Sequence, residues 1–390
     1  MEKVACPPYD VVSTEEARRL AAGVAESFLH VTRGEIDLPP GADPYGEGVY
    51  AKCRDNLDRM IAEGWLAQDD TPQLYIYHQR MGRHRQTGVV CCASVRDYLE
   101  GRIKKHEKTR PHKEDDRTRH MQSLSAHAEP VFLTYRAVPA IDEAIERVAT
   151  RDPVYDFEST DGVLHRLWPV GGDAAWALVQ LFDERVDTLY VADGHHRSAA
   201  AARVHESLRG DGRGHDGFLA VIFPHDQMNI LAYNRLVKDG AGRDRAALLA
   251  ALKKRLDVVT TDSPAPDVHG AFGIYLGGGQ WYRATALPGT YDARDPVAAL
   301  DGQVCQDLIL GPVFGVHDPR LDQQLDFVGG VHGAAGLEAP VDAGEADLAI
   351  FLHPTEMEQV MTVSDLGAVL PPKSTWFEPK LRSGLFVHRF

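Results

Sequence analysis

The sequence has few cysteines, no long apolar run and a deficit of positive charge. Its five cysteines form no CxxC pair, which argues against a disulfide framework or a cysteine-ligated zinc site and is typical of reduced thiols. The segment from Met1 to Asp10 lacks the apolar region of a signal peptide. No run approaches the roughly 20 apolar residues that span a bilayer. We therefore expect a cytoplasmic protein with no membrane partner.

The charge and length narrow the class of protein further. A formal net charge of −15 argues against a general nucleic-acid binder, because such a surface needs a positive field. With 390 residues, of which 44% are hydrophobic and 25% charged, the chain has a globular composition and the length of two or three domains. Alternating strand-like and helix-like segments predict a mixed α/β (α+β) fold.

A strand–turn–helix pattern lies near the middle of the chain. The apolar run from Leu189 to Ala192 predicts a buried strand, and the residues from Ser198 to Arg203 are mostly strong helix formers. Between them stand five residues without an apolar side chain: Asp193, Gly194, His195, His196 and Arg197.

Such a turn aims free backbone N–H groups at an anion. Arg197 adds a planar fork of donors that suits phosphate or carboxylate, and Asp193 only accepts hydrogen bonds when it is ionised. The alternative is an ordinary Asp-Gly turn followed by a capped helix with two surface histidines. Five consecutive polar residues between a strand and an alanine-rich helix favour a binding site.

The stretch from Gly101 to Met121 is strongly charged and almost free of apolar residues. One interpretation is a solvated helix with local ion pairs, such as Glu114 with Arg117. However, Pro111 interrupts a continuous helix, and three histidines alternate with acids and bases as they do in an active-site lining. A phosphate-handling site needs lysine, arginine and a carboxylate base, so this second interpretation stays open.

Other segments give local predictions. Ser13 and Glu16 have the spacing of a capping box, residues 27–31 read as a strand, and residues 73–79 and 87–95 read as a hairpin. Residues 210–217 predict a loop. In the polar tail, anion binding and docking by aromatic side chains are equally good interpretations of a group of four residues: Lys373, Ser374, Thr375 and Lys380.

Several motifs together resemble a large prokaryotic family catalogued as domain of unknown function 1015. They cover nearly the whole chain: Pro7 to Val11, Ser27 to Val31, His106 to Arg117, Ala192 to Arg197 and Pro372 to Thr375. In that family a short stretch usually precedes the Pro-Pro-Tyr-Asp motif, so we expect an N-terminal strand to be missing from this chain.

The turn at residues 193–197, with its upstream His-Glu pair, is similar to the ParB/sulfiredoxin superfamily, which binds nucleotide phosphates at a helix start. The resemblance implies a ParB/sulfiredoxin-like mixed-sheet core at residues 96–240. It also implies α/β regions at residues 1–95 and 241–390, the latter with a tail that docks back on the core. From the free-serine kinases of that superfamily, the resemblance implies that Glu107 is a catalytic base and Arg197 a phosphate ligand.

Three chemistries occur in the superfamily, and the residues discriminate among them. Sulfiredoxin activity needs a cysteine in the turn, where this chain has His195. A ParB-like nucleotide-hydrolysing, nucleic-acid-associated protein needs a basic surface, which the net charge disfavours. We therefore expect phosphoryl transfer from ATP or ADP, with Mg²⁺ on the phosphates, to a small hydroxylated amino acid, with L-serine first. A non-catalytic nucleotide or metabolite sensor is the alternative, and a homodimer stays open.

The expected site has a catalytic set and a binding set. Catalysis is expected from Glu107, Asp193 and His196. Nucleotide or phosphate contacts are expected from Gly194, His195, Arg197, Ser198, Lys113, Arg117, Lys373, Ser374 and Thr375. No protein side chain is predicted as a metal ligand.

Overall fold

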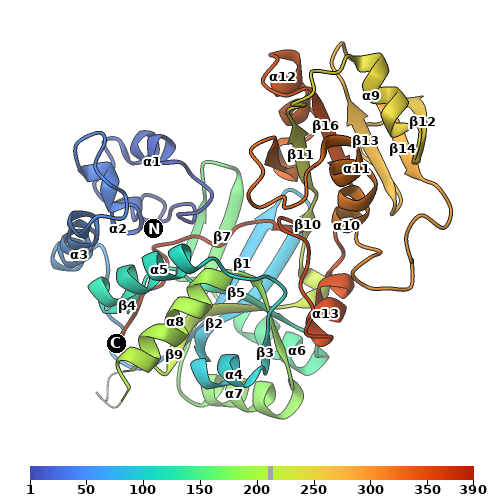
Figure 1. Cartoon of the computed structure of the whole chain (residues 1–390). Helices are drawn as coiled ribbons and strands as arrows, with labels where there is room; N and C mark the ends of the chain where they lie inside the picture. Colours follow the sequence, from blue (N-terminus) through green and yellow to red (C-terminus); the bar gives the residue numbers. More distant parts are fainter. Residues whose placement is uncertain (210–213) are drawn as a thin grey trace. The chain divides into compact units, whose positions relative to one another are not determined.

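The computed structural model describes residues 1–209 and 214–390, so the predicted loop at 210–217 lies partly outside the described residues. The chain forms two compact units (Figure 1). The first unit contains Met1–Met228 and Pro379–Phe390, and the second contains Asn229–Glu378.

A mixed eight-stranded sheet organises the first unit. In their order across the sheet, its strands are β3 (Ile103–Lys104), β8 (Leu189–Asp193), β5 (Val131–Tyr135), β9 (Gly217–Pro224), β2 (His84–Ser94), β1 (Leu74–Met81), β7 (Val163–Val170) and β6 (Tyr155–Glu158). The pairs β3–β8 and β5–β9 are parallel and the remaining pairs are antiparallel. The predicted mixed α/β class and the predicted β1–β2 hairpin are therefore confirmed.

Helices cover one face of this sheet. The longer helices of the first unit after its N-terminal segment are α4 (Val95–Glu100), α5 (Pro111–Leu124), α6 (Pro139–Ala149), α7 (Gly172–Arg185) and α8 (His195–Ser207). Their buried side chains join alternate strand residues in one apolar cluster, for example Val191 of β8 with Val204 of α8. Because successive residues of a strand point to opposite faces, this alternation fixes the face on which α8 lies.

The N-terminal segment forms a smaller apolar cluster of its own, built on α1 (Thr14–Ala21), α2 (Leu29–Thr32) and α3 (Glu47–Ala62). The capping box of Ser13 and Glu16 is confirmed at the start of α1. The predicted strand at residues 27–31 is wrong, because Leu29–Thr32 is a short helix. Phe28, Leu29 and Val31 all pack into the same cluster, as a compact helical turn permits.

The second unit is built on an antiparallel six-stranded sheet. In spatial order its strands are β12 (Leu256–Thr261), β14 (Trp281–Ala286), β13 (Ala271–Tyr275), β16 (Leu348–Leu352), β11 (Tyr233–Val237) and β15 (Leu325–Gly329). A separate pair joins β10 (Ile230–Leu231) to β17 (Trp376–Phe377). Its helices are α9 (Arg245–Leu252), α10 (Asp301–Cys305), α11 (Gly311–Phe314), α12 (Ala335–Asp342) and α13 (Met357–Asp365), with a π-helical turn at Gln306–Leu310.

Both faces of the second sheet are covered. Val237 of β11 belongs to an apolar cluster with α9, α10 and α11, whereas the preceding Leu236 belongs to a cluster with α12. Neighbouring residues of one strand thus contact helices on opposite sides, as a three-layer arrangement requires.

The two compact units differ from the three predicted regions. The boundary predicted between residues 95 and 96 separates β2 from α4 inside the first unit, and the boundary predicted at residue 240 follows the observed one at residue 228. Residues 379–390 belong to the first unit, where β18 (His388–Arg389) pairs with β4 (Ala126–His127).

Among the described helices, none is both long enough and apolar enough to cross a membrane. All five cysteines are free thiols, and burial raises the pKa of Cys53 and of Cys91 to about 12.

The close packing of β2 against β9 gives a test of the first sheet. A Cβ atom on Gly88 would lie 2.8 Å from the Ile222 carbonyl oxygen and 2.9 Å from the Phe223 ring. Gly88→Ala should therefore lower the free energy of unfolding by about 1–3 kcal/mol. Urea denaturation measures it. As a control, Gly48→Ala in α3 meets nothing within 4 Å and should be neutral or stabilising by up to about 1 kcal/mol. An unchanged midpoint for Gly88→Ala would contradict this packing.

Candidate functional site

The turn between β8 and α8 has the predicted geometry. Gly194 adopts a left-handed conformation with φ of +98°, and α8 begins at the next residue, His195. A Cβ atom on Gly194 would also lie 3.1 Å from Nε of Arg197, so both the backbone angle and the space favour glycine. The helix starts three residues earlier than the helix formers alone suggested. Its first-turn N–H groups therefore come from the motif itself.

Ion pairs hold the carboxylate of Asp193 at the end of β8. Lys380 Nζ lies 3.0 Å from Oδ2 of Asp193, and Arg197 Nη2 lies 3.7 Å from Oδ1. Burial alone would raise the pKa of Asp193. Lys380 first, and then Arg197, outweigh burial and hold the pKa of this carboxyl well below its ordinary value. Asp193 is therefore ionised and already paired with two cations.

Arg197 is a buried residue whose guanidinium contacts protein acceptors. Its side chain is 4% exposed, Nη1 donates to the Pro130 carbonyl oxygen at 2.5 Å, and Nη2 lies 4.0 Å from Asp10. Burial would lower the pKa of Arg197, but Asp10 and Asp193 outweigh it and raise the pKa. These contacts fix Arg197 as an internal support of the turn. Its predicted contact with phosphate stays a prediction.

Three histidines surround the turn, and all of them favour the neutral form. His106 and His195 pack edge to face with their ring centroids 4.4 Å apart. Burial lowers the pKa of His106 to about 4, and burial followed by His106 holds the pKa of His195 well below its usual value. Burial also lowers the pKa of His196, whose Nε2 accepts a hydrogen bond from the Arg110 N–H at 3.1 Å. At neutral pH these rings are hydrogen-bonding groups and not cations.

His195 carries an unsatisfied polar atom. Its Nε2 is buried and has no hydrogen-bond partner within the described part of the chain. An unpaired polar atom costs free energy when it is buried, so it commonly marks a place where a ligand or water binds.

Glu107 lies beside this ring. Its Oε2 is 3.9 Å from Nδ1 of His195, and its side chain is 46% exposed. The wide gap in sequence between Glu107 and the turn is therefore closed by the fold, because β3 pairs in parallel with β8 just before each of them. The structure thus places a solvent-accessible carboxylate next to the start of α8.

The predicted residues on α5 line a small polar pocket. Pro111 is the first residue of this helix and begins it, which is the position in a helix that best tolerates proline. Lys113 Nζ donates to the hydroxyl of Tyr45 at 3.0 Å. The pocket has a volume of about 140 Å³ and is lined by Tyr9, Thr14, Thr32, Arg33, Glu35, Pro44, Tyr45, Val49, Tyr50, Cys53, Lys113, Asp116, Arg117 and His120.

Arg117 connects this pocket to buried carboxylates. Its guanidinium lies over the Tyr9 ring at 3.9 Å and forms ion pairs with Asp116 at 2.8 Å and Glu129 at 3.3 Å. Glu129 also accepts hydrogen bonds from the Tyr9 N–H and the Ser383 hydroxyl. Burial raises the pKa of Glu129 against the opposing charge of Arg117. Glu129 is not predictable from the sequence, since a single glutamate before a strand carries no pattern.

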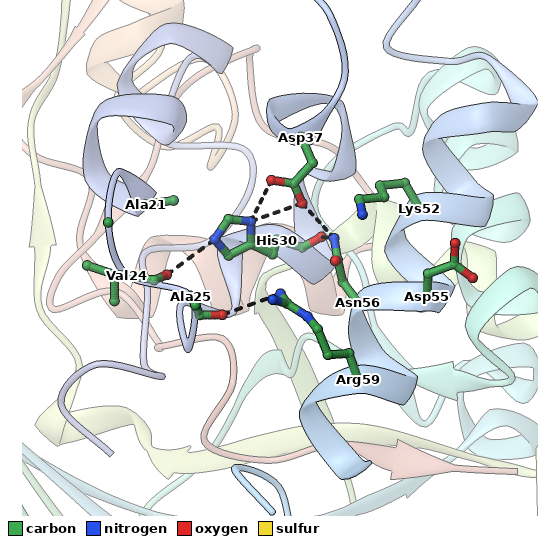
Figure 2. Close-up of a pocket in the computed structure, with 10 residues that line it drawn as sticks. Ala21, Val24, Ala25, His30, Asp37, Lys52, Asp55, Asn56 and Arg59 are labelled. Carbon is green, nitrogen blue, oxygen red and sulfur yellow. Dashed lines mark hydrogen bonds and ion pairs between the residues drawn. The ribbon is translucent and has the colours of Figure 1, made fainter. Parts of the chain in front are cut away.

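A larger, shallower pocket of about 600 Å³ lies over α3 and the preceding loops (Figure 2). Several of its polar side chains form hydrogen bonds with other side chains or with the backbone. His30 Nδ1 lies 2.8 Å from Asp37, whose other carboxylate oxygen accepts from Asn56 at 2.7 Å, and Arg59 donates to the Ala25 carbonyl oxygen at 3.4 Å. None of the predicted site residues lines this pocket. We therefore centre the candidate site on the turn at Gly194.

The remaining predicted residues lie elsewhere. Ser198 is buried inside α8, and its hydroxyl donates to the His195 carbonyl oxygen at 3.1 Å. Lys373, Ser374 and Thr375 belong to the second unit, where Lys373 Nζ lies 5.3 Å from the centroid of the Tyr233 ring. Of the tail residues with anion-binding potential, Lys380 is the one in the first unit.

The comparisons with known proteins give one family match. The family described as "Protein of unknown function (DUF1015)" matches residues 1–303. No curated protein sequence matches the chain.

Several solved structures are similar at low identity. A free serine kinase variant in complex with AMP is 14% identical with a TM-score of 0.38, and the alignment covers 74% of this chain and 87% of that one. C-terminally truncated SbnI from Staphylococcus aureus is 12% identical with a TM-score of 0.42, covering 77% and 87%. A conserved hypothetical protein from Pyrococcus furiosus is 16% identical with a TM-score of 0.34, covering 74% and 90%.

The pairing of Lys380 with Asp193 predicts a pH-dependent effect on stability. Lys380→Met should lower the free energy of unfolding at neutral pH by about 1–3 kcal/mol, less than for a lone buried pair because Arg197 remains. The folded-state pKa of Asp193 is depressed, so the contribution of the pair is present above the unfolded value of about 3.9. It is lost as the pH falls from there through the folded-state pKa.

Urea denaturation across this pH range is the measurement, and the gap between wild type and Lys380→Met should narrow in acid. The control is Lys3→Met, which removes an exposed ion pair with Glu26 and should change stability by less than about 0.5 kcal/mol. Equal stability of wild type and Lys380→Met at neutral pH would refute the role of this pair.

Proposed function

This chain belongs to the DUF1015 family of proteins of unknown function, and we propose that it is a nucleotide-dependent phosphotransferase. The proposed reaction transfers a phosphoryl group from ATP or ADP to the hydroxyl of a free amino acid, with L-serine as the first candidate. The proposed setting is the cytoplasm, with no nucleic-acid or membrane partner.

The observation that carries the proposal is the start of α8. A glycine with positive φ follows a strand and is followed directly by the first turn of a 13-residue helix. Such a terminus binds phosphate through its N–H groups and its dipole. We assign the main phosphate contacts to the backbone N–H groups from His195 to Arg197, since the Ser198 N–H already donates to the Gly194 carbonyl oxygen, and to the His195 ring, whose buried Nε2 lacks a protein partner in the described structure. The buried Arg197 side chain is proposed to stabilise this backbone through its contacts with Asp193, Asp10 and the Pro130 carbonyl oxygen.

Glu107 is the proposed general base. Its exposed carboxylate lies beside His195, so an acceptor hydroxyl held there can give its proton to Glu107 while its oxygen attacks the terminal phosphorus. The bond between that phosphorus and the bridging oxygen breaks, and the shortened nucleotide leaves with the electron pair. Asp193 and His196 are proposed to position the turn, since Lys380 pairs with one and the Arg110 N–H with the other.

We propose that the pocket lined by Lys113, whose lining contains neither Glu107 nor a residue of the turn, receives the anionic end of the acceptor. Its volume of about 140 Å³ is below the roughly 300–1,000 Å³ of pockets for drug-sized ligands, so it suits a small molecule. Arg33 pairs with Glu35 at 2.9 Å and Arg117 with Asp116, whereas Lys113 donates to the hydroxyl of Tyr45. Lys113 is thus the cation proposed to meet an anionic group of the substrate.

A metal ion and further contacts complete the proposal. Mg²⁺ would neutralise the nucleotide phosphates, as in other phosphoryl-transfer enzymes. Lys373, Ser374 and Thr375 remain proposed phosphate contacts, and a homodimer remains open. A nucleotide consumption assay over serine, homoserine, threonine and simple alcohols tests the reaction, with ³¹P NMR to identify the product. Nucleotide binding without turnover of any acceptor would favour the sensor alternative instead.

Removing the base should separate chemistry from binding. Glu107→Gln keeps the size of the side chain and should retain nucleotide binding while turnover falls by roughly a hundredfold or more. Steady-state kinetics and calorimetric nucleotide titration measure the two effects. Glu143→Gln, on the exposed side of α6, is the matched control and should be as active as wild type. Near-normal turnover by a folded Glu107→Gln variant would remove Glu107 from the mechanism.

Two lysines distinguish the two pockets. Lys113→Ala should raise KM for the acceptor by about tenfold, because a charge-assisted contact of about 1.4 kcal/mol is lost. Lys52→Ala changes the lining of the larger pocket in Figure 2 and should leave KM within about twofold of wild type. A larger effect from Lys52→Ala would move the acceptor to that pocket.

A further inference from the structure

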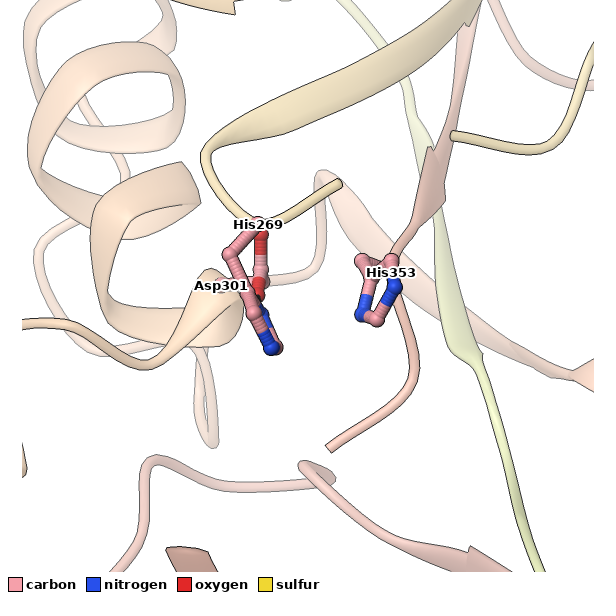
Figure 3. A group of neighbouring side chains, drawn as sticks. All are labelled: His269, Asp301 and His353. Carbon is pink, nitrogen blue, oxygen red and sulfur yellow. Dashed lines mark hydrogen bonds and ion pairs between the residues drawn. The ribbon is translucent and has the colours of Figure 1, made fainter. Parts of the chain in front are cut away.

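Two histidines and an aspartate meet at one end of the second sheet (Figure 3). His269 lies just before β13, His353 directly follows β16, and Asp301 is the first residue of α10. In the sheet, Phe272 of β13 pairs with Leu352 of β16, so this register brings the two histidines to the same end of the two neighbouring strands.

The three side chains have close contacts with one another. One potential ligand atom from each residue lies within 4.8 Å of the other two. The imidazole centroids of His269 and His353 are 4.3 Å apart, and Nδ1 of His269 lies 2.5 Å from Oδ2 of Asp301. A zinc ion bound at about 2.0–2.2 Å holds its ligand atoms roughly 3.4 Å from one another, a spacing that small side-chain rotations of these three residues can reach.

Neighbouring groups orient these side chains as the surroundings of a metal site do. Nδ1 of His353 lies 3.0 Å from the Pro354 carbonyl oxygen, which leaves Nε2 as the nitrogen with a lone pair. The Gly270 N–H donates to Oδ1 of the buried Asp301 at 2.7 Å. Backbone groups thus hold two of the three side chains, His353 and Asp301.

The local charge favours a cation. The ion-pair partner of Asp301 is His269, and Glu356 Oε1 lies 3.6 Å from Nε2 of the same ring. Two carboxylates therefore face a pair of imidazoles. Imidazole and carboxylate ligands together suit zinc and similar divalent transition metals better than Mg²⁺ or Ca²⁺, which prefer oxygen ligands only.

We infer that His269, Asp301 and His353 form a binding site for a divalent transition metal of the zinc class. Glu356 lies close enough to supply a further carboxylate. This site belongs to the second unit and shares no residue with the proposed phosphotransferase site, so either inference can fail without the other.

The test is a calorimetric titration of the full-length, tag-free and chelator-treated protein with Zn²⁺ alone. Wild type should bind one equivalent tightly, and Zn²⁺ should raise its melting temperature. His353→Gln should weaken this binding by at least about tenfold and reduce the thermal shift. The control His332→Gln removes an exposed histidine of the same unit and should bind Zn²⁺ as wild type does.

Asp301→Asn is the second test variant, since it keeps the size of the side chain but removes its charge. If this variant does not fold, His353→Gln decides alone, with its melting temperature in chelator as the check of folding. Absence of saturable Zn²⁺ binding by wild type would overturn the inference. Equal Zn²⁺ affinity in wild type and His353→Gln would overturn it as well, because the ion would then bind at other histidines of the chain.

Discussion

The candidate site depends on one constraint: the negative charge of the Asp193 carboxylate must be paired with positive charges. A charge at the end of a buried strand must be paired, and Lys380 and Arg197 supply the opposite charges. Lys380 belongs to the C-terminal segment, and Arg197 also contacts Pro130 before β5 and Asp10 near the N-terminus. The charge of Asp193 thus connects its own turn to Lys380 directly, and to Pro130 and Asp10 through Arg197.

The same electrostatics decide what a ligand meets. Arg117 is matched by Asp116 and Glu129, and Arg197 by Asp193 and Asp10, so these guanidiniums carry little uncompensated charge. Burial keeps the surrounding histidines neutral. In the proposed function, an anionic ligand would therefore meet backbone N–H groups and the more exposed side chains first. Arg197 is thus a component of an internal charge network, and its predicted contact with phosphate stays a prediction.

The local elements of secondary structure that depend on residues close together in the chain could be predicted from the sequence. The β8–Gly194–α8 unit, the β1–β2 hairpin and the capping box of Ser13 all follow from short patterns of apolar, glycine and polar residues. The strand predicted at residues 27–31 was wrong because a short segment with apolar residues at positions 28, 29 and 31 fits both a strand and a buried helical turn. The position of Lys380, 187 residues away from Asp193 in sequence, has no local signal at all.

The proposed metal site was also not predictable from short sequence patterns. His269, Asp301 and His353 lie tens of residues apart, without the spacing of a known zinc motif. The antiparallel register of β13 and β16 brings the two histidines to the same end of these strands, and the start of α10 adds the carboxylate. In the first unit each buried carboxylate near the turn has a lysine or arginine partner, whereas Asp301 and Glu356 both pair with a single imidazole. That difference in charge balance is why we assign an anion to one site and a cation to the other.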